Sequence, residues 1–340
     1  MKKSVRGLAF VPALFLILSA QTASIYAQSG ETRAGEIARL QDQIERTSGK
    51  WVAGETSVSN LPESEWLNLV GLSVTAIKAD PLPETYRALP ASMDWRSENG
   101  NYVTNVRHQQ KCGSCWAFAM AGALESYVLR TRNMPGVDLD LSEQVMLSCS
   151  GAGTCQGGQL NANFLQKTGL PAESAYPYTA ADGTCSSAAA GWQKTAYKID
   201  GWGSVSQSLS SIKSALASYG PLPIAMMVYE DFMHYKSGVY TYTTGKRLGG
   251  HAVILVGYND QERYFIVKNS WGTGWGENGF FRIDYSELNS SVSFGLSAIA
   301  YKYTGPKNAD GDGADAGGLA VDTAWTRTAP LFESMRQWVQ

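Results

Sequence analysis

Histidine is scarce in this chain of 340 residues, which has only three, and its 28 basic residues nearly balance its 30 acidic ones. Because no strong field of either sign results, nucleic acid and anionic membrane surfaces are not expected as partners. The five cysteines include a single Cys-x-x-Cys pair, which with so few histidines argues against a zinc cluster. The chain also lacks an uninterrupted apolar run of the roughly 20 residues that span a bilayer.

The beginning of the chain has the pattern of an export signal. Lys2, Lys3 and Arg6 precede an apolar run from Leu8 to Leu18, and small residues follow. We therefore exclude residues 1–27 from the fold and expect an exported protein that binds no membrane after signal removal. The final location, extracellular, periplasmic or in a lysosome-like vesicle, stays open. Export favours paired thiols, and an odd number of cysteines leaves one over.

The remaining sequence divides into a polar leader, a folded body and a tail. Residues 28–88 contain a helical pattern around Leu40 and end in a proline-rich, extended hinge. From 89 to 303 the composition is dense in aromatic residues, glycine and cysteine, which indicates the packed domain. Residues 304–340 begin with an acidic, glycine-rich run. We interpret that run as a flexible linker, since it lacks the closing glutamate of a calcium loop.

Helical and strand patterns occur in different parts of the body. A buried helix is predicted to begin at Cys115 and run to Arg130. Later segments are short, rich in β-branched and aromatic residues, and bounded by Gly or Asn, as strands are. They are Pro223–Val228, Ala252–Tyr258 and Tyr264–Lys268. This order predicts an α+β fold with a helical half at about 96–200 and a β-rich half at about 201–303.

The strongest chemical signal is the Cys-Gly-Ser-Cys-Trp motif within the segment from Gln109 to Phe118. A cysteine nucleophile needs a proton acceptor nearby, since the thiolate and not the thiol attacks. His251 follows downstream in Gly-Gly-His-Ala-Val, and Asn269 lies in Lys-Asn-Ser-Trp-Gly. With these partners in this order, the chain resembles the papain family of cysteine proteases from about residue 89 to residue 303.

Taken singly, each of these residues has a simpler interpretation. Cys112 and Cys115 have a spacing that also occurs in redox and zinc sites. His251 suits a buried structural histidine at the head of a strand, and Asn269 suits a turn. Their joint occurrence, in the order that the chemistry needs, favours the protease interpretation. The other two histidines are predicted to be structural or surface residues: His108 and His234.

The resemblance implies a papain-like two-domain fold, with a helical left domain, an antiparallel β-barrel-like right domain and the active cleft between them. Cys115 would form a thioester with the substrate, and His251 would move the protons. Asn269 would orient His251 under the cover of Trp271. Gln109 would stabilise the oxyanion together with the Cys115 backbone N–H. No metal or organic cofactor is implied.

Substrate contacts and disulfides are implied in the same way. The substrate-binding positions would be Gly157, Gly158, Gln159, Leu160, Ala225, Gly249, Gly250, Trp271 and Ile299. The pocket for the side chain two residues before the scissile bond, the P2 residue, would be apolar or small apart from Gln159. A hydrophobic P2 residue is therefore expected. The pairs Cys112–Cys155 and Cys149–Cys185 would leave Cys115 as the free thiol.

Two positions depart from the family pattern. A third disulfide, common in the second domain of relatives, is missing, because Gly245 and Phe294 stand at the matching positions. That half must rely on packing alone. Gln110 stands where glycine is usual, which predicts a differently shaped loop around Gln109.

Residues 28–88 resemble the short propeptides of cathepsin B-like relatives, notably at 50–54 and 66–71. The alternative is a mere linker. The resemblance implies that this leader lies backwards in the substrate groove, blocks Cys115 and is removed near 88–91. We expect low pH to loosen it by protonating acidic contacts.

The predicted function is thus that of a monomeric, exported endopeptidase, made as a precursor and acting on proteins or peptides. The leader would be its intramolecular inhibitor. Two other functions stay open: a catalytically silent relative that uses the cleft for binding, and a peptide ligase that passes the acyl group to an amine instead of water.

Overall fold

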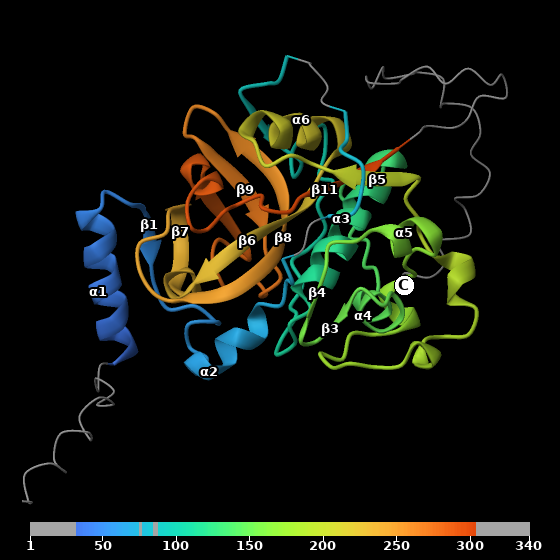
Figure 1. The fold of residues 1–340 in the computed structure, drawn as a ribbon, viewed down its shortest axis with the longest axis horizontal. Helices are drawn as coiled ribbons and strands as arrows, with labels where there is room; N and C mark the ends of the chain where they lie inside the picture. Colours follow the sequence, from blue (N-terminus) through green and yellow to red (C-terminus); the bar gives the residue numbers. More distant parts are fainter. Residues whose placement is uncertain (1–31, 75–76, 84–87, 304–340) are drawn as a thin grey trace, which may run out of the picture.

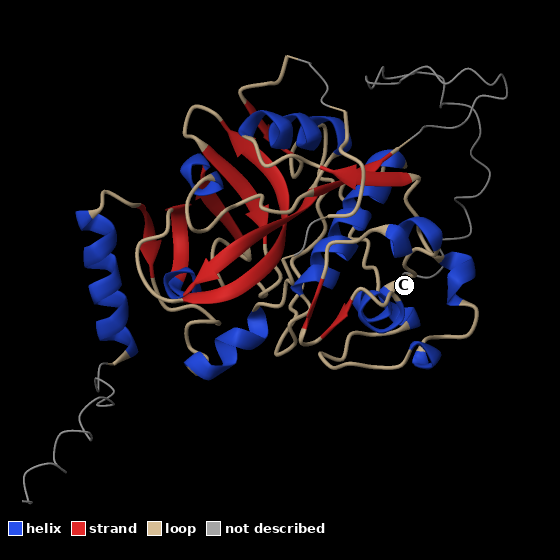
Figure 2. Ribbon diagram, in the orientation of Figure 1, coloured by secondary structure: helices blue, strands red, loops and turns tan. Residues whose placement is uncertain are grey.

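The computed structural model describes residues 32–74, 77–83 and 88–303. The predicted signal at 1–27 and the predicted tail at 304–340 lie outside these described residues. A curled sheet and a group of helices lie side by side, with the long helix α3 (Cys115–Thr131) against the sheet (Figures 1 and 2). This is the α+β arrangement that the sequence predicts. Within the described ranges, no helix has the length and apolarity of a membrane span.

The main sheet has seven strands, of which six follow the path β1-β7-β10-β9-β8-β2, while β6 pairs with β8. They are β1 (Lys50–Ala53), β2 (Ser92–Asp94), β6 (Leu222–Tyr229), β7 (Tyr235–Tyr240), β8 (Arg247–Asn259), β9 (Tyr264–Lys268) and β10 (Phe280–Asp284). Only β7 and β10 run parallel. The three predicted strands are confirmed: β9 at its predicted bounds, and β6 and β8 as longer strands.

The other elements flank this sheet. The helices besides α3 are α1 (Arg33–Arg46), α2 (Glu63–Trp66), α4 (Glu143–Cys149), α5 (Asn163–Lys167) and α6 (Leu209–Tyr219). The short strands are the pair β3 (Gly153–Thr154) and β4 (Gly157–Gly158), and the pair β5 (Gly201–Ser204) and β11 (Ile299–Lys302). The 3-10 turns are η1 (Leu67–Leu69), η2 (Glu173–Ala175), η3 (Cys185–Ser187), η4 (Trp192–Thr195), η5 (Glu230–His234) and η6 (Tyr285–Leu288).

The two halves overlap more than the sequence predicts. Strand β2 stands at the start of the body, yet it joins the sheet of the second half, with Met93 opposite Tyr258. Helix α6 lies within the β-rich half. Strand pairing places β2 in this sheet, because an edge of β8 can accept an antiparallel partner from any part of the chain.

Covalent cross-links and aromatic packing stabilise different halves. Disulfides join Cys112 to Cys155 and Cys149 to Cys185, the pairs that the resemblance implies. The β-rich half has none among its described residues. Phe294 is fully buried there, with its ring 5.3 Å from that of Phe265. Aromatic packing of this kind contributes beyond the area that it buries.

The leader is built into the folded body. Its strand β1 pairs with β7, and Trp51 packs on the rings of Tyr235 and Tyr240 at 6.1 and 5.3 Å. Helix α1 lies outside β1 (Figure 1). Beyond α2, the chain enters the region between the two halves. A linker without a fixed position would bury none of these aromatic side chains.

Candidate active site

Adjacent strands bring His251 and Asn269 together. His251 lies in β8, and Asn269 directly follows β9, the antiparallel partner of β8. The His251 Nε2–H donates to Asn269 Oδ1 at 2.8 Å, which also accepts from Ser270 N. The neutral ring therefore has its proton on Nε2, and Nδ1 has no hydrogen-bond partner among the described residues. The Trp271 ring covers this pair, 4.7 Å from the His251 ring.

Cys115, the free cysteine of the described residues, begins helix α3 and is fully buried. Burial raises the pKa of its thiol to about 11, against the effect of backbone N–H groups that include those of Ala252 and Gly71. Since Ala252 follows His251, the thiol lies beside the strand that carries the imidazole. Burial lowers the pKa of His251 to about 4, although the hydrogen bond to Asn269 opposes this. Burial therefore favours the neutral form of both groups.

Gln109 is held at two points by Ser270. Gln109 N donates to Ser270 O at 2.9 Å, and Ser270 Oγ donates to Gln109 Oε1 at 2.7 Å. The second bond turns the amide so that its Nε2 donates to the Leu69 carbonyl of the leader at 3.1 Å and to the Cys112 carbonyl at 2.9 Å. Trp271 Nε1 donates to the same carbonyl at 3.3 Å. Ser270 was not predicted, although its place directly after Asn269 was a signal.

The loop after Gln109 accommodates Gln110 in a conformation that glycine adopts most easily. Its φ is 54°, in the left-handed region, and its N–H donates to His108 Nδ1 at 3.0 Å. His108 is exposed, so of the two predicted alternatives, structural or surface, the surface one is confirmed. The Gln109 side chain itself contacts the leader, through its bond to the Leu69 carbonyl.

Residues 69–73 of the leader run between Gly158 and Gly250. The N–H groups of Gly71 and Leu72 donate to Gly250 O at 3.0 and 2.9 Å, and Gly158 N donates to Gly71 O at 2.8 Å. The bridge between Leu72 and Gly158 is parallel.

Gly71 lies at the tightest contact of this segment. A Cβ on Gly71 would lie 2.1 Å from Gly113 O, so only glycine fits against the loop before Cys115.

A comparison of the sequence with models of known protein families identifies the family of this chain. A family model described as papain family cysteine protease matches residues 89–298. The chain belongs to the papain family of cysteine proteases. The α+β two-domain fold and the cysteine peptidase class that the sequence predicts are thereby confirmed.

Curated relatives and solved precursors are similar to this papain-family chain. A cathepsin L-like proteinase of Fasciola hepatica is 41% identical over 229 residues, covering 65% of this chain and 67% of that protein. Ananain of Ananas comosus is 34% identical over 268 residues, covering 75% and 74%. The structure of a digestive procathepsin L2 proteinase from Tenebrio molitor larval midgut matches with a TM-score of 0.70 and 27% identity, covering 80% of this chain and 90% of that one.

The predicted P2 pocket of this papain-family chain combines buried and accessible positions. Ala225 in β6 and Ile299 in β11 are fully buried, and Leu160 is also buried, whereas Gln159 is exposed. Gly249 is in contact with the leader, because a Cβ there would lie 3.0 Å from Val70 Cγ2. The two glycines before Gln159 border the same segment. They are Gly157 and Gly158.

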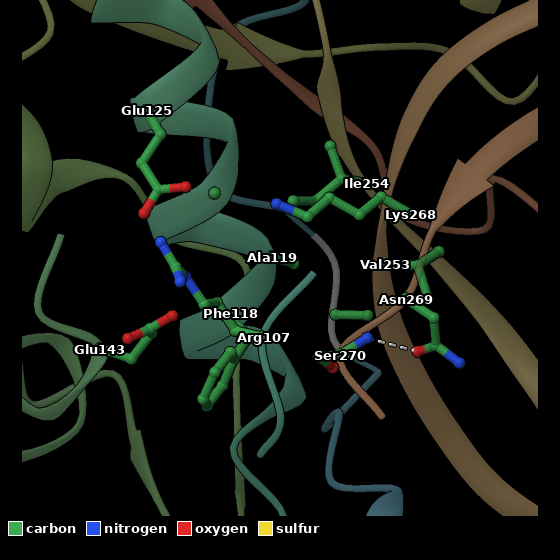
Figure 3. A pocket seen from close by; sticks show the side chains of 12 residues that line it. Arg107, Phe118, Ala119, Glu125, Glu143, Val253, Ile254, Lys268, Asn269 and Ser270 are labelled. Atoms are coloured by element: carbon green, nitrogen blue, oxygen red, sulfur yellow. Dashed lines mark hydrogen bonds between the residues drawn. The ribbon is translucent and has the colours of Figure 1, made fainter. Parts of the chain in front are cut away.

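Behind the site, a small cavity is lined by both charged and apolar side chains (Figure 3). Lys268, directly before Asn269, extends toward Glu125 of helix α3 in this view. Lys268 Nζ donates to Thr104 Oγ1 at 3.0 Å, and Thr104 Oγ1 donates to Glu125. Glu125 also accepts from Leu141 N at 3.0 Å. An almost fully buried ionic network thus connects the helix of Cys115 to the strand that Asn269 follows.

Proposed function

We propose that this chain is the inactive precursor of an exported cysteine endopeptidase with a preference for a hydrophobic P2 residue. One observation carries the proposal: residues 69–73 occupy the groove over Cys115, with the Leu69 carbonyl at the Gln109 amide. Because the leader is itself a peptide and lies in the groove over Cys115, this groove is suited to bind a peptide substrate. The N-terminal pattern of charged, apolar and small residues supports export.

The proposed reaction begins with transfer of the Cys115 thiol proton to His251 Nδ1, and the resulting thiolate attacks the scissile carbonyl. The new carbon–sulfur bond makes the carbonyl oxygen an oxyanion, which accepts from Gln109 Nε2 and the Cys115 N–H. His251 then gives its Nδ1 proton to the leaving nitrogen, the carbon–nitrogen bond breaks, and an amine and a thioester result. Asn269 and Trp271 keep the His251 Nδ1 directed at the thiol throughout.

Hydrolysis completes the cycle. His251 Nδ1 takes a proton from water, whose oxygen adds to the thioester carbon, and the oxyanion returns to the same donors. The carbon–sulfur bond breaks, which releases the acid and restores Cys115. A peptide ligase would use an amine at this step, so the products distinguish the two.

Two properties of the leader account for inactivity in the precursor. Its parallel pairing with Gly158 supports a reversed direction, which puts the leaving nitrogen on the side away from a productive substrate. Its burial of Cys115 and His251 also favours the neutral thiol and imidazole over the reactive ion pair. Removal of residues up to about 88 would return water to the site and allow thiolate to form at the helix N-terminus.

Hydrolysis of fluorogenic peptides by the processed protein tests the proposal. We expect cleavage of a peptide with leucine or phenylalanine at P2, and slower cleavage by at least about tenfold with arginine or glutamate there, since a charge would be buried without a partner. Iodoacetamide should abolish the activity by alkylating one thiol, which mass spectrometry assigns to Cys115.

Each contrary outcome indicates a different function. Alkylation of Cys115 without any peptide hydrolysis, after proven removal of the leader, would favour the silent binding protein. Transfer of the acyl group to an added amine, in preference to water, would favour the ligase. Equal cleavage of all four peptides would reject the hydrophobic P2 preference alone.

The contact between His234 and the leader predicts how acidity affects activation. His234 is 1% exposed, which rules out the surface alternative, and its Nε2 lies 3.2 Å from Glu36 Oε1. Burial lowers its pKa, as does Arg33, whereas Glu36 and Glu230 raise it, and the net direction is downward. Dissociation of the leader exposes the ring and restores a pKa of about 6.5. His234 therefore binds a proton more tightly in the open state.

The sign of the effect follows from proton linkage. The contribution of neutral His234 to the closed state is complete above pH 6.5 or so and is lost as the pH falls toward the lowered value. We expect leader release by the precursor to accelerate from pH 7 to pH 5, and to depend less on pH in His234→Phe. The rate of release, followed by gel at each pH, measures this. A variant with an unchanged pH profile would assign the effect to carboxylates alone.

A further inference from the structure

The side chain of Tyr178 connects the two donors of the proposed oxyanion site. Its Oη–H donates to the backbone carbonyl of Gln109 at 2.8 Å, and Ser114 Oγ lies 2.7 Å from the same Oη. Since Tyr178 uses its only hydrogen for Gln109, the Ser114 hydroxyl donates to Tyr178. Gln109 supplies the side-chain donor, and Ser114 directly precedes Cys115, whose N–H is the backbone donor.

The Ser114 side chain hydrogen-bonds to Tyr178 and makes no capping bond to its own helix. A serine before the first residue of a helix usually accepts from an N–H of the first turn, which stabilises the helix. Ser114 makes no such side-chain bond, whereas Ser142 and Ser208 do so at α4 and α6. The Ser114 hydroxyl thus lies closest to Tyr178, with the Cys112 carbonyl 3.4 Å away, and not at an N–H of its own helix.

The ring of Tyr178 is held independently of its hydroxyl. It packs edge-on against Phe118, in the first turn of α3, with ring centroids 4.8 Å apart. The hydroxyl is partly buried, and burial raises the pKa of the phenol. It therefore stays protonated and keeps its donor across the working pH range. Removing the oxygen alone leaves this packing in place.

The loop that receives this bond contains a backbone conformation that costs free energy. Gln110, next to Gln109, has a φ of 54°, in the left-handed region that is unfavourable for residues other than glycine. Ser270 holds Gln109 to the β-rich half, and Tyr178 holds it to the nucleophile helix. Through Ser114, Tyr178 connects the Gln109 backbone to the residue before Cys115. The Cys112 carbonyl, which accepts from Gln109 Nε2 at 2.9 Å, connects the Gln109 side chain to the same loop.

We propose that Tyr178 is a positioning residue that sets the spacing of the two oxyanion donors through its bonds to Gln109 and Ser114. This inference rests on the proposed function, because the spacing matters only if a tetrahedral oxyanion forms. Enzymes lose about 10²–10³ in kcat when one such donor is removed, and a displaced donor costs part of that.

The test compares Tyr178→Phe with the wild type after both leaders have been removed by an added protease of another class. We expect kcat for a peptide amide to fall by about 5- to 30-fold with KM within twofold, since the interaction is made in the transition state. The rate of Cys115 alkylation by iodoacetamide should stay within twofold, because displacement of iodide forms no oxyanion. Tyr176→Phe, two residues away, is the matched control and should change neither rate.

The outcomes separate this inference from the proposed function. A wild type that hydrolyses no peptide would refute the proposed function. An active wild type with unchanged kcat in Tyr178→Phe would overturn the positioning role, as would a parallel fall in hydrolysis and alkylation, which indicates general damage.

Two further variants keep the inference testable if Tyr178→Phe is poorly folded. Ser114→Ala, which removes the other half of the connection, should lower kcat in the same direction. In a Gln109→Ala background, Tyr178→Phe should cost less than about twofold more, because the donor that it positions is gone. A full additional loss would contradict the role.

Discussion

Cys115→Ala in the processed protein should lower kcat/KM for a hydrophobic P2 peptide by at least about 10⁴-fold, because no other group in the site can form the thioester. His251→Ala should fall to a similar level. The double variant should lose little more, since nucleophile and base act as one unit. Steady-state hydrolysis under reducing conditions measures all three.

Binding provides the control for this prediction. Cys115→Ala should still bind a hydrophobic P2 peptide with an affinity similar to the KM of the wild type, because the pocket is untouched. Residual activity of more than about one hundredth that of the wild type, if it resists further purification, would mean that another nucleophile acts and would reject the mechanism.

Lys268→Met is expected to lower the free energy of unfolding by about 3–5 kcal/mol, which is the usual effect of removing one partner of a buried ionic contact. Lys268 and Glu125 are both almost fully buried and connected through Thr104. Without Lys268, the Glu125 carboxylate loses one of two neighbouring cations, the other being Arg107. Denaturant unfolding of the Cys115→Ala precursor, which cannot digest itself, gives the value.

A matched double variant isolates the charge. Lys268→Met combined with Glu125→Gln keeps an acceptor for Leu141 N but removes the buried carboxylate, so at least half of the lost stability should return. If the double variant is as unstable as the single one, packing of the Lys268 chain and not its charge explains the loss.

The dependence on pH gives a second check of the same contact. Burial raises the pKa of Glu125, while Lys268 lowers it. A carboxyl group with a raised pKa favours the folded state below its unfolded pKa, about 4.3, and this contribution is lost as the pH rises through the folded value. Lys268→Met should therefore differ less from the wild type near pH 4 than at pH 7.

Local patterns predicted much of the fold, and pairing decided the rest. The helix from Cys115 and the strands at 223–228, 252–258 and 264–268 were recognisable because their apolar residues follow helical or extended spacing. The places of β2 at one edge of the sheet and β1 at the other were not recognisable from the sequence, because the three or four residues of a short strand have no periodic signal. Strand partners are set by contacts far apart in the chain.

The site shows the same division. Cys115, His251, Asn269 and Gln109 were predicted from motifs, because a thiol nucleophile needs these residue types in this order. Ser270, Tyr178 and His234 acquired roles only in the structure: a hydroxyl or an imidazole has many possible partners, and the sequence alone does not say which one it meets.

By itself, the sequence determined the chemistry and the identity of the family, since both depend on residue types at short, regular spacings. Only the tertiary structure decided the state of the site. The leader crosses the groove in parallel with Gly158, places Leu69 against Gln109 and excludes water from Cys115 and His251. These effects arise from burial and from contacts across 40 residues or more, and such distances leave no pattern in the chain.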